Sequence, residues 1–423
     1  MTVSQASFVS PVHGGLAAPV DRIVGSHLAT QWAGFAQVQV NDVDRTTMYR
    51  IGDGTLSPLT GPMGSADMKT VLDSMWIERD GKKWAWTIPI VLPVTDAEAA
   101  IAEASIERGD IALAQDGMVF GKISVTEVLD WDKKEFVEKV YGTKRTDHPG
   151  ARLWLDDPRT KLIAGEIELL AFQDERPFAD RILSPTQTRE LVESKGYEQT
   201  VAFQTRNPLH RAHEYALVYG AEVILRETGK KTGVILNPLV GQLKGDDVPA
   251  ATRMATYERL VEGKFLGQGD KDEELWKSKG QDLDQNLHLV GLDMRMFYGG
   301  PREAVMHAIY RQNLGFTHFI IGRKHADAPY DDKTAIWGDF DAQEIFGKLE
   351  GALAIKTVNV GFAAYFEEIK RVGLVTENEG NTMVSISGTK MRQLLDAGEA
   401  PDERLMRRST AEVLIEFYRN KQA

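Results

Sequence analysis

The chain has 423 residues, which is long enough for two or three domains with separate hydrophobic cores. Its net charge of −12 argues against a general nucleic-acid binder, because such proteins usually carry a basic domain. Cysteine is absent, which excludes disulfides, thiolate nucleophiles and cysteine-ligated metals.

Features of the whole sequence also bear on location. No run of eighteen or more apolar residues is present, so we expect no transmembrane helix and no membrane partner. Residues 1–20 lack the basic start and the apolar block of a secretory signal. Together with the absence of cysteine, these features fit a cytoplasmic protein.

The first 150 residues contain short apolar stretches separated by Gly, Pro and Asp, a pattern typical of a β-rich domain. A small barrel is one architecture that would fit, and a helix is expected within the domain over residues 97–108. Examples of this strand pattern are residues 86–92, 111–114 and 118–125.

From about Pro185 the pattern changes to alternating strands and helices, which predicts a parallel sheet that binds its ligands at the carboxyl ends of the strands. The predicted strands are residues 200–203, 234–236, 287–290 and 319–321. The predicted helices are residues 188–195, 209–227, 303–314, 389–395 and 410–419.

The most informative segment is residues 204–214, Gln-Thr-Arg-Asn-Pro-Leu-His-Arg-Ala-His-Glu, which follows the apolar run 201–203. It holds two of the nine histidines, His210 and His213, spaced so that both can face one side of a first helical turn. Arg206 and Arg211 concentrate positive charge in this acidic chain. A strand that leads into a helix N-terminus with free N–H groups is a common phosphate site. An inert capping turn and, more remotely, a metal site are the alternatives.

Two further polar clusters resemble anion sites. Residues 322–326, Gly-Arg-Lys-His-Ala, follow the predicted strand 319–321, and Arg323 could fork two hydrogen bonds onto phosphate while Gly322 lets the backbone approach a ligand. Residues 385–392, Ser-Ile-Ser-Gly-Thr-Lys-Met-Arg, enter a helix, where Lys390 or Arg392 could contact phosphate. A solvated basic loop and a simple N-cap are the respective alternatives.

A fourth loop, residues 237–247, places Lys244 between glycines after the predicted strand 234–236, where it could cover a polyphosphate or form an ordinary turn. The chain has no Gly-x-x-x-x-Gly-Lys-Ser/Thr motif, which excludes a P-loop. It also lacks Gly-x-Gly-x-x-Gly, which argues against a dinucleotide oxidoreductase. Four such loops after apolar strands favour a nucleotide or another multi-anion substrate.

These motifs resemble the ATP sulfurylase (sulfate adenylyltransferase) family, in its bacterial form without a fused kinase domain. Residues 204–213 look like its signature, residues 322–326 like its second motif and residues 386–389 like its late motif. Further similar segments lie at residues 141–143, 148–150, 292–295 and 299–304.

The resemblance implies an α/β protein. A β-rich PUA-like N-terminal domain (residues 1–184) would precede a Rossmann-like nucleotidyltransferase domain (185–355). A small C-terminal α/β region (356–423) would complete the nucleotide site. The implied reaction is ATP + sulfate ⇌ adenosine 5′-phosphosulfate + pyrophosphate. It would proceed by in-line attack without a covalent enzyme intermediate, and Mg²⁺ would arrive with ATP or pyrophosphate.

The resemblance also implies roles for individual residues. The catalytic group would be Thr205, Arg206 and Asn207. Sulfate would be bound by Gln204, Arg206 and the backbone N–H of Ala326. ATP would be bound by Gln204, Arg206, Asn207, His210, His213, Gly322, Arg323 and His325.

Three residues depart from the family pattern. Lys324 stands where Asp is usual, Asp327 where Gly is common, and Asn237 where His is frequent. The extra cation at Lys324 prompts the hypothesis that the enzyme works in the ATP-forming direction of sulfur oxidation. We also expect a homo-oligomer, with a dimer favoured.

Two other functions remain open from sequence. One is an adenylyltransferase of the same helix-start type that acts on a phosphorylated or carboxylated acceptor. The other is RNA binding by the β-rich domain, which the acidic charge and the lack of a basic aromatic stripe oppose.

Overall fold

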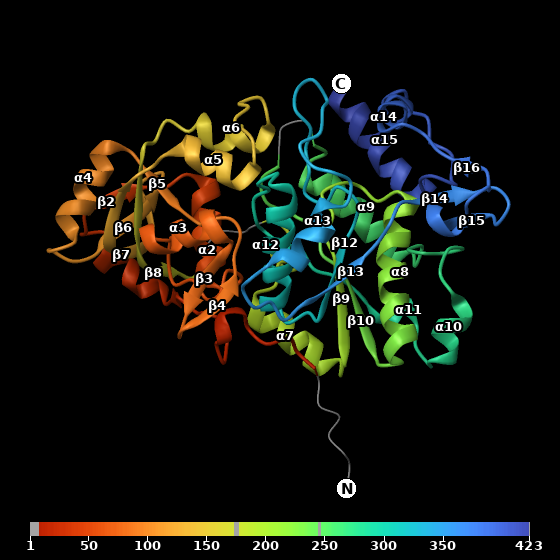
Figure 1. Cartoon of the computed structure of the whole chain (residues 1–423), viewed down its shortest axis with the longest axis horizontal. Helices are drawn as coiled ribbons and strands as arrows, with labels where there is room; N and C mark the ends of the chain where they lie inside the picture. The colour runs from red at the N-terminus through yellow and green to blue at the C-terminus, as the bar shows by residue number, and fades with distance from the viewer. Residues whose placement is uncertain (1–7, 173–176, 244–246, 423) are drawn as a thin grey trace, which may run out of the picture.

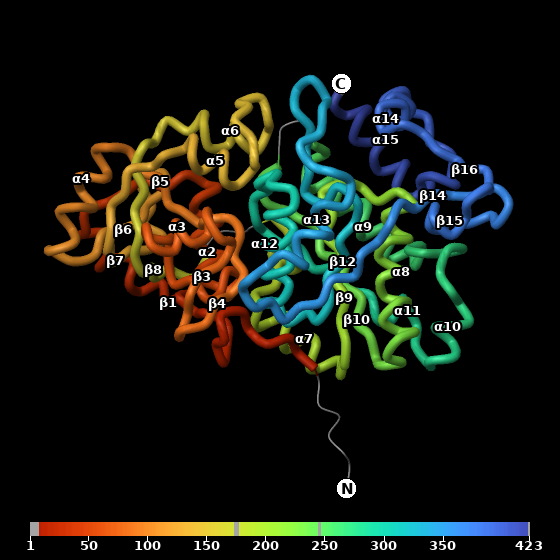
Figure 2. The backbone as a smooth tube through the Cα atoms, viewed as in Figure 1, coloured from red at the N-terminus to blue at the C-terminus, as the bar shows by residue number. Residues whose placement is uncertain are grey.

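The computed structural model describes residues 8–172, 177–243 and 247–422, and the predicted phosphate contact of Lys244 lies outside these residues. An N-terminal part, a central parallel sheet with its helices, and a C-terminal part follow one another along the longest axis (Figure 1). Figure 2 shows the N-terminal and C-terminal parts at opposite ends of the central sheet. No helix in the described part of the chain is both long and apolar enough to cross a bilayer.

The N-terminal part is built on a mixed sheet in the order β1-β8-β7-β6-β2, with β5 also pairing with β8. In the described residues this order has two ends, so the sheet is open rather than the small barrel that the sequence allowed. Its strands and the separate β3–β4 hairpin are β1 (Ile23–Val24), β2 (Gln37–Gln39), β3 (Trp76–Arg79), β4 (Lys82–Ala85), β5 (Leu92–Val94), β6 (Ile111–Gln115), β7 (Met118–Asp130) and β8 (Lys161–Leu170).

The helices of this part are α1 (Ala29–Trp32), α2 (Asp42–Gly52), α3 (Ser65–Ser74), α4 (Asp96–Ser105), α5 (Lys133–Tyr141) and α6 (Pro149–Leu155). The helix predicted at residues 97–108 is confirmed as α4, which begins in a capping box formed by Thr95 and Glu98. Short 3-10 turns occur at His13–Gly15, Ser26–Leu28, Ile345–Lys348 and Val375–Glu377.

The strands expected at residues 111–114 and 118–125 are confirmed, whereas the pattern at 86–92 is misleading. Only Leu92 of that stretch belongs to a strand. The preceding residues are buried but bond to other elements. The Trp86 indole N–H donates to the Ile88 carbonyl, and the Thr87 hydroxyl donates to the Arg302 carbonyl. A buried segment can therefore have the composition of a strand although it pairs with no neighbouring strand.

The central sheet is entirely parallel, as predicted, in the order β11-β10-β9-β12-β13. Its strands are β9 (Gln199–Phe203), β10 (Thr232–Leu236), β11 (Leu287–Leu289), β12 (His318–Ile321) and β13 (Lys356–Asn359). Alternate residues of β9 face opposite cores: Val201 and Phe203 enter one and Ala202 enters the other. Strands buried on both faces are continuously apolar, which is why most of them could be read from the sequence.

The helices around this sheet are α7 (Pro185–Ser194), α8 (Arg211–Thr228), α9 (Ala250–Glu262), α10 (Glu273–Ser278), α11 (Leu283–Asn286), α12 (Gly300–Asn313) and α13 (Asp341–Glu344). The three helices predicted between Pro185 and residue 314 are confirmed, apart from their ends, as α7, α8 and α12. Helix α12 lies between the N-terminal part and the sheet (Figure 1) and is buried on both sides. Val305 and Met306 join the N-terminal core, while Ala304 and Ala308 join the core against the sheet.

The C-terminal part contains the antiparallel sheet β15-β14-β16 and two helices, α14 and α15, both of which the sequence predicted. The elements are β14 (Ala363–Phe366), β15 (Arg371–Leu374), β16 (Met383–Val384), α14 (Gly388–Asp396) and α15 (Arg408–Gln422). The two helices share a small apolar cluster that includes Leu395 and Leu414.

Candidate active site

A cavity of about 330 Å³ opens at the carboxyl ends of β9, β12 and β13. Strand order reverses between β9 and β12, because the chain adds β10 and β11 on one side of β9 and then β12 and β13 on the other. In open parallel sheets such a switch point leaves a crevice between diverging loops. The cavity therefore lies where the topology predicts a ligand site.

The cavity brings the two leading motifs together. All ten residues to which the family resemblance assigned a role line it: Gln204, Thr205, Arg206, Asn207, His210, His213, Gly322, Arg323, His325 and Ala326. The geometry shows a shared location, and the individual roles stay predictions.

Residues 204–207 form a tight turn directly after β9. The Thr205 hydroxyl donates to the Asn207 carbonyl at 2.9 Å and accepts the Asn207 N–H at 3.1 Å. Tyr257 donates to the same Asn207 carbonyl at 2.8 Å. Thr205 is thus engaged inside the turn, so its side chain holds the shape of the turn. The buried Gln204 side chain has an amide oxygen without a hydrogen-bond partner.

Arg206 is the cation at the junction of three loops. Its guanidinium donates to the Asp327 carbonyl at 3.2 Å and pairs with the Asp247 carboxylate at 3.3 Å. It also lies over the Tyr298 ring at 5.2 Å. Its side chain is 21% exposed, which keeps the guanidinium accessible from the cavity.

His210 and His213 face the cavity from the first turn of α8, with stacked rings whose centroids lie 3.7 Å apart. Burial lowers the pKa of His210 to about 4. Burial first, and then the neighbouring His210, lowers the pKa of His213 well below its ordinary value. Both rings are therefore neutral near pH 7 and offer N–H donors rather than positive charge. The Nδ1 atom of His213 is buried without a partner.

The other charges of the first motif do not serve the cavity. Arg211 binds Asp270 through two hydrogen bonds of 2.9 and 2.5 Å, and its backbone N–H donates to the Leu405 carbonyl. Glu214 is fully buried and pairs with Arg407 at 2.7 Å. The expectation that Arg211 adds to a local anion field is wrong, because this guanidinium ties α8 to the loop before α10.

The second motif forms a strained turn above β12. Lys324 and Ala326 have φ values of 51° and 57°, a left-handed conformation that costs about 1 kcal/mol or more for a non-glycine residue. Gly322 has no such backbone requirement, and a Cβ at this position would meet no protein atom within 4 Å. The space beside Gly322 is therefore left open by the protein itself.

Arg323 and Lys324 both line the cavity and share one counterion. Asp339 accepts from Arg323 at 3.0 Å and lies 3.5 Å from the Lys324 ammonium. The Arg323 guanidinium also lies 4.7 Å from the centre of the Phe362 ring. Both cations are about two-fifths exposed, so their charge is only partly offset.

A buried chain of titratable groups supports the second motif from below. His325 lies 3.0 Å from His307, and His307 lies 3.3 Å from the Glu303 carboxylate. Burial raises the pKa of Glu303 to about 7, although the N–H groups of Phe297 and Gly299 donate to it and oppose the shift. Burial also lowers the pKa of His307 and of His325 well below the ordinary value.

The third wall of the cavity was not predicted from the sequence. Residues 360–363 follow β13 and, together with Met296, supply apolar surface to the cavity. Phe362 is 42% exposed, an unusual state for a large apolar side chain beside a polar cavity. The signal that could have found this wall is the strand-end rule applied to β13, but Lys356–Asn359 is too polar to be recognised as a buried strand.

In the described part of the chain, the predicted segments 385–392 and 237–243 do not line the cavity. Lys390 and Arg392 lie on α14, which packs against α15, and neither residue lines the cavity. The phosphate contact considered for them is not supported, and Ser387 is the N-cap of the helix instead. Asn237 is fully buried. Its side-chain amide donates to the Val290 carbonyl and its backbone carbonyl accepts from Arg311, so it belongs to the core.

Comparison with known proteins assigns the chain to a family. The profile of the family described as ATP-sulfurylase matches residues 179–417, and that of the PUA-like domain matches residues 13–172. This chain belongs to the ATP-sulfurylase family. It is 64% identical over 421 residues to the sulfate adenylyltransferase of Pyropia yezoensis, covering 98% of this chain and 99% of that protein.

More distant members of the ATP-sulfurylase family agree. The sulfate adenylyltransferase of Symbiobacterium thermophilum is 34% identical over 90% of this chain and 88% of its own length. A solved structure described as a hexameric APS kinase from Thiobacillus denitrificans superposes with a TM-score of 0.68 at 18% identity. That superposition covers 97% of this chain and 68% of the solved one, and it shows a shared fold.

No group of three or more His, Asp or Glu side chains suited to a metal ion occurs among residues 8–172, 177–243 and 247–422. The cavity wall in the described part of the chain contains no Asp or Glu at all. Its polar groups are cations, neutral imidazoles, amides and a hydroxyl. Such a lining suits a ligand that is itself strongly anionic.

Proposed function

We propose that this ATP-sulfurylase catalyses the reaction ATP + sulfate ⇌ adenosine 5′-phosphosulfate + pyrophosphate in the cavity at the strand ends. The observation that carries the proposal is the composition of the cavity: two motifs that supply three cations and three neutral histidines, and an apolar wall at residues 360–363. A triphosphate and an inorganic anion fit the polar motifs, and a purine ring fits the apolar wall. The names of the relatives support the same reaction.

The proposed chemistry is in-line displacement. A sulfate oxygen forms a bond to the α-phosphorus while the bond from that phosphorus to the bridging oxygen breaks, and pyrophosphate leaves with the electron pair. No proton transfer and no covalent enzyme intermediate are needed, so positioning and charge stabilisation carry the catalysis.

The residues divide between the two anions. Gln204, Arg206 and the backbone N–H of Ala326 bind sulfate. Arg206 is also the group that offsets charge at the α-phosphate, with Asn207 beside it and Thr205 holding their turn. The ATP phosphates lie against His210, His213, Gly322, Arg323 and His325.

The neutral state of the histidines has a consequence for this proposal. An uncharged imidazole donates a hydrogen bond to a phosphate oxygen but adds no positive charge that would hold the anion in place. Pyrophosphate can therefore leave more readily than from a site of fixed cations. Binding of the anion raises the pKa of His210 and His213 towards the ordinary value.

Mg²⁺ enters the proposal as part of the substrate. The ion would arrive bound to ATP or pyrophosphate and would neutralise part of the polyphosphate charge. The absence of carboxylates from the described cavity wall supports delivery with the nucleotide over a dedicated protein cage.

The test is pyrophosphate-dependent formation of ATP from adenosine 5′-phosphosulfate by the purified protein, followed by luminescence. The proposal expects ATP at a rate proportional to enzyme, with Mg²⁺ required. Absence of ATP would refute the proposed reaction. Formation of ATP only when another adenylylated acceptor replaces adenosine 5′-phosphosulfate would show that the chain is an adenylyltransferase of different specificity.

The physiological direction, assembly and location are further parts of the proposal. Asp339, the counterion that Lys324 shares with Arg323, offsets only part of the positive charge of Lys324, the charge that prompted the hypothesis of an ATP-forming role. We propose a cytoplasmic homo-oligomer, with a dimer favoured, which light scattering after gel filtration can test.

A further inference from the structure

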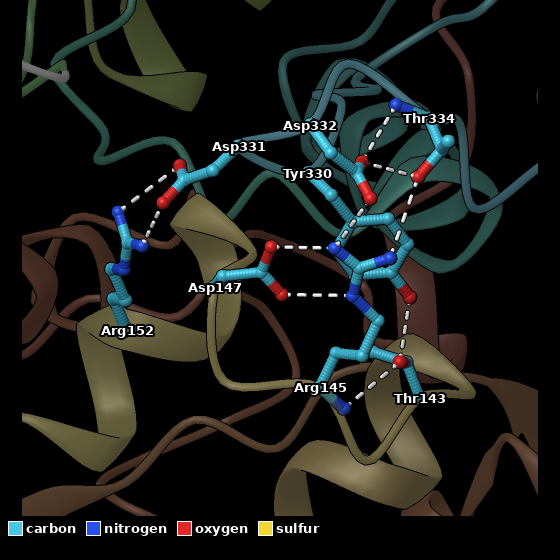
Figure 3. A network of polar contacts seen from close by, with 8 residues as sticks. All are labelled: Thr143, Arg145, Asp147, Arg152, Tyr330, Asp331, Asp332 and Thr334. Atoms are coloured by element: carbon cyan, nitrogen blue, oxygen red, sulfur yellow. Dashed lines mark hydrogen bonds and ion pairs between the residues drawn. The ribbon is translucent and has the colours of Figure 1, made fainter.

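The loop that follows the second motif leaves the sheet and reaches the N-terminal part. It starts at the cavity with Lys324 and Ala326 and returns to the second motif at Asp339, whose carbonyl accepts the Lys324 N–H at 2.8 Å. Between these points residues 327–338 lie against residues 143–152 of the N-terminal part, as Figure 3 shows for the polar contacts.

The exposed contacts form two sets around aspartates of the loop. Arg145 forks onto Asp147 at 2.8 and 2.6 Å, reaches Asp332 at 3.0 Å, and lies 3.7 Å from the centre of the Tyr330 ring. Arg152 donates two hydrogen bonds to Asp331 (Figure 3). Single exposed ion pairs contribute little, but a network with stacked and forked geometry restricts the loop more strongly.

The buried contacts are more specific. The Tyr330 hydroxyl donates to the Thr143 hydroxyl at 2.6 Å. His148 is fully buried between the Tyr330 and Trp337 rings. Its Nδ1 accepts the Gly150 N–H at 3.2 Å, so its Nε2 carries the proton and donates to the Ala328 carbonyl at 2.9 Å.

This contact lies one residue from a carbonyl that holds Arg206. Asp327, whose carbonyl accepts a hydrogen bond from Arg206 at 3.2 Å, precedes the Ala328 carbonyl held by His148. Between the cavity and Ala328 the backbone is left-handed at both Lys324 and Ala326. A turn with that strain keeps its shape only when its surroundings hold it, and His148 lies on the N-terminal side of the contact.

We propose that residues 143–152 of the N-terminal part position the loop 324–339, with His148 fixing the Ala328 carbonyl and thereby the turn that orients Arg206. The motif segments at 141–143 and 148–150, which no substrate contact explains, then have a function in the transfer step. The inference rests on the proposed function, because the orientation of Arg206 matters only if the cavity carries out the transfer.

The first measurement needs no activity. Hydrogen exchange of the full chain reports the Lys324, Asp327 and Tyr330 amides, which donate to Asp339, Lys324 and Thr334. In His148→Ala we expect exchange at these amides to accelerate at least tenfold, and in His148→Gln, whose amide can still donate to the Ala328 carbonyl, to stay within about threefold of wild type. Unchanged exchange in His148→Ala would overturn the proposal.

The second measurement is kinetic and separates positioning from stability. At a temperature where every variant is folded, His148→Ala should lower kcat at least tenfold with KM for pyrophosphate changed less than threefold, and His148→Gln should recover most of kcat. In the Arg206→Lys background the same His148→Ala change should have a much smaller effect, because both changes act on one group. Equal effects in both backgrounds would contradict action through Arg206.

Controls keep the outcomes distinct. Lys83→Glu breaks an exposed ion pair with Glu350 that also joins the N-terminal part to the rest of the chain, but neither residue lines the cavity. It should leave both exchange and kcat unchanged. If His148→Ala does not fold, Tyr330→Phe removes only the hydroxyl bonded to Thr143 and should give the same pattern at smaller amplitude; its absence there would also overturn the proposal. If the wild-type protein shows the expected exchange pattern but has no activity, the proposed function is refuted, whereas the structural contact of residues 143–152 with the loop 324–339 is supported.

Discussion

Arg206 and Arg211 lie five residues apart in one motif, yet the structure gives them different tasks. Arg206 faces the cavity, whereas Arg211 is committed to Asp270. We expect Arg206→Ala to lose turnover in both directions and remain folded, and Arg211→Ala to lose stability and retain turnover per folded molecule.

The magnitudes follow from charge and burial. A guanidinium about 4 Å from an anion at an effective dielectric constant of about 20 contributes about 4 kcal/mol. Asp247, 3.3 Å from Arg206, offsets part of this charge, so we expect a loss of about 3 kcal/mol, or roughly 10²-fold in kcat/KM. The Asp270 side chain is fully buried, and removal of Arg211 leaves it without its ionic partner, which typically costs about 3–5 kcal/mol in the free energy of unfolding.

The assay is ATP formation from adenosine 5′-phosphosulfate and pyrophosphate, alongside urea unfolding of both variants. Arg206→Lys separates charge from geometry, because an ammonium keeps the charge but cannot fork between Asp247 and the Asp327 carbonyl. Activity of Arg206→Ala within about tenfold of wild type would refute the assignment. So would a folded, fully stable Arg211→Ala that has lost activity.

Three further predictions concern the space beside Gly322, the charge of Lys324 and the buried histidines. Gly322→Ala should unfold at the same temperature as wild type but raise KM for the nucleotide. The control Gly300→Ala should lose stability, because Gly300 has a φ of 51° and the added Cβ would lie 2.4 Å from Trp337. A normal KM for Gly322→Ala would show that no ligand occupies the space beside Gly322. Lys324→Asp should shift the ratio of forward to reverse kcat towards adenosine 5′-phosphosulfate formation, and an unchanged ratio would remove the hypothesis of an ATP-forming role. The free energy of unfolding should fall by several kcal/mol from pH 6.5 to 4. In this pH range each buried neutral histidine takes up a proton only on unfolding, so each lowers the free energy of unfolding by about 1.4 kcal/mol per pH unit as the pH falls. Glu303, whose pKa is raised to about 7, acts oppositely and stabilises the fold as the pH falls from about 7 to 4.5. Chemical denaturation at several pH values checks this, and a flat profile would contradict the burial of the four histidines whose pKa is lowered to about 4, His13, His210, His288 and His318.

Much of the catalytic half could be read from the sequence because its strands are buried on both faces. Apolar runs such as residues 201–203 and 319–321 are recognisable as buried strands from the sequence alone. Because ligands bind at the carboxyl ends of parallel strands, the polar residues that follow these strands are expected in one crevice. Strand β13 escaped this reasoning since Lys356 and Asn359 are exposed at the edge of the sheet, and the cavity wall after it was missed.

Other features depend on partners far away in the chain and leave no local trace. Nothing in the first motif shows that Arg211 meets Asp270, and nothing near His148 shows that it meets the Ala328 carbonyl. The strand-like run 86–92 misled for the same reason, because its hydrogen bonds go to α12 and to neighbouring loops. Sequence pattern reports burial well, but it does not report which element covers a residue.

The most direct test of the account is exchange of labelled pyrophosphate into ATP by the purified protein with Mg²⁺, in the presence and absence of sulfate. Direct attack of sulfate on the α-phosphorus predicts exchange that requires sulfate and disappears in Arg206→Ala. Exchange without sulfate would reveal an adenylylated enzyme and contradict the mechanism, and no exchange with sulfate would contradict the activity itself.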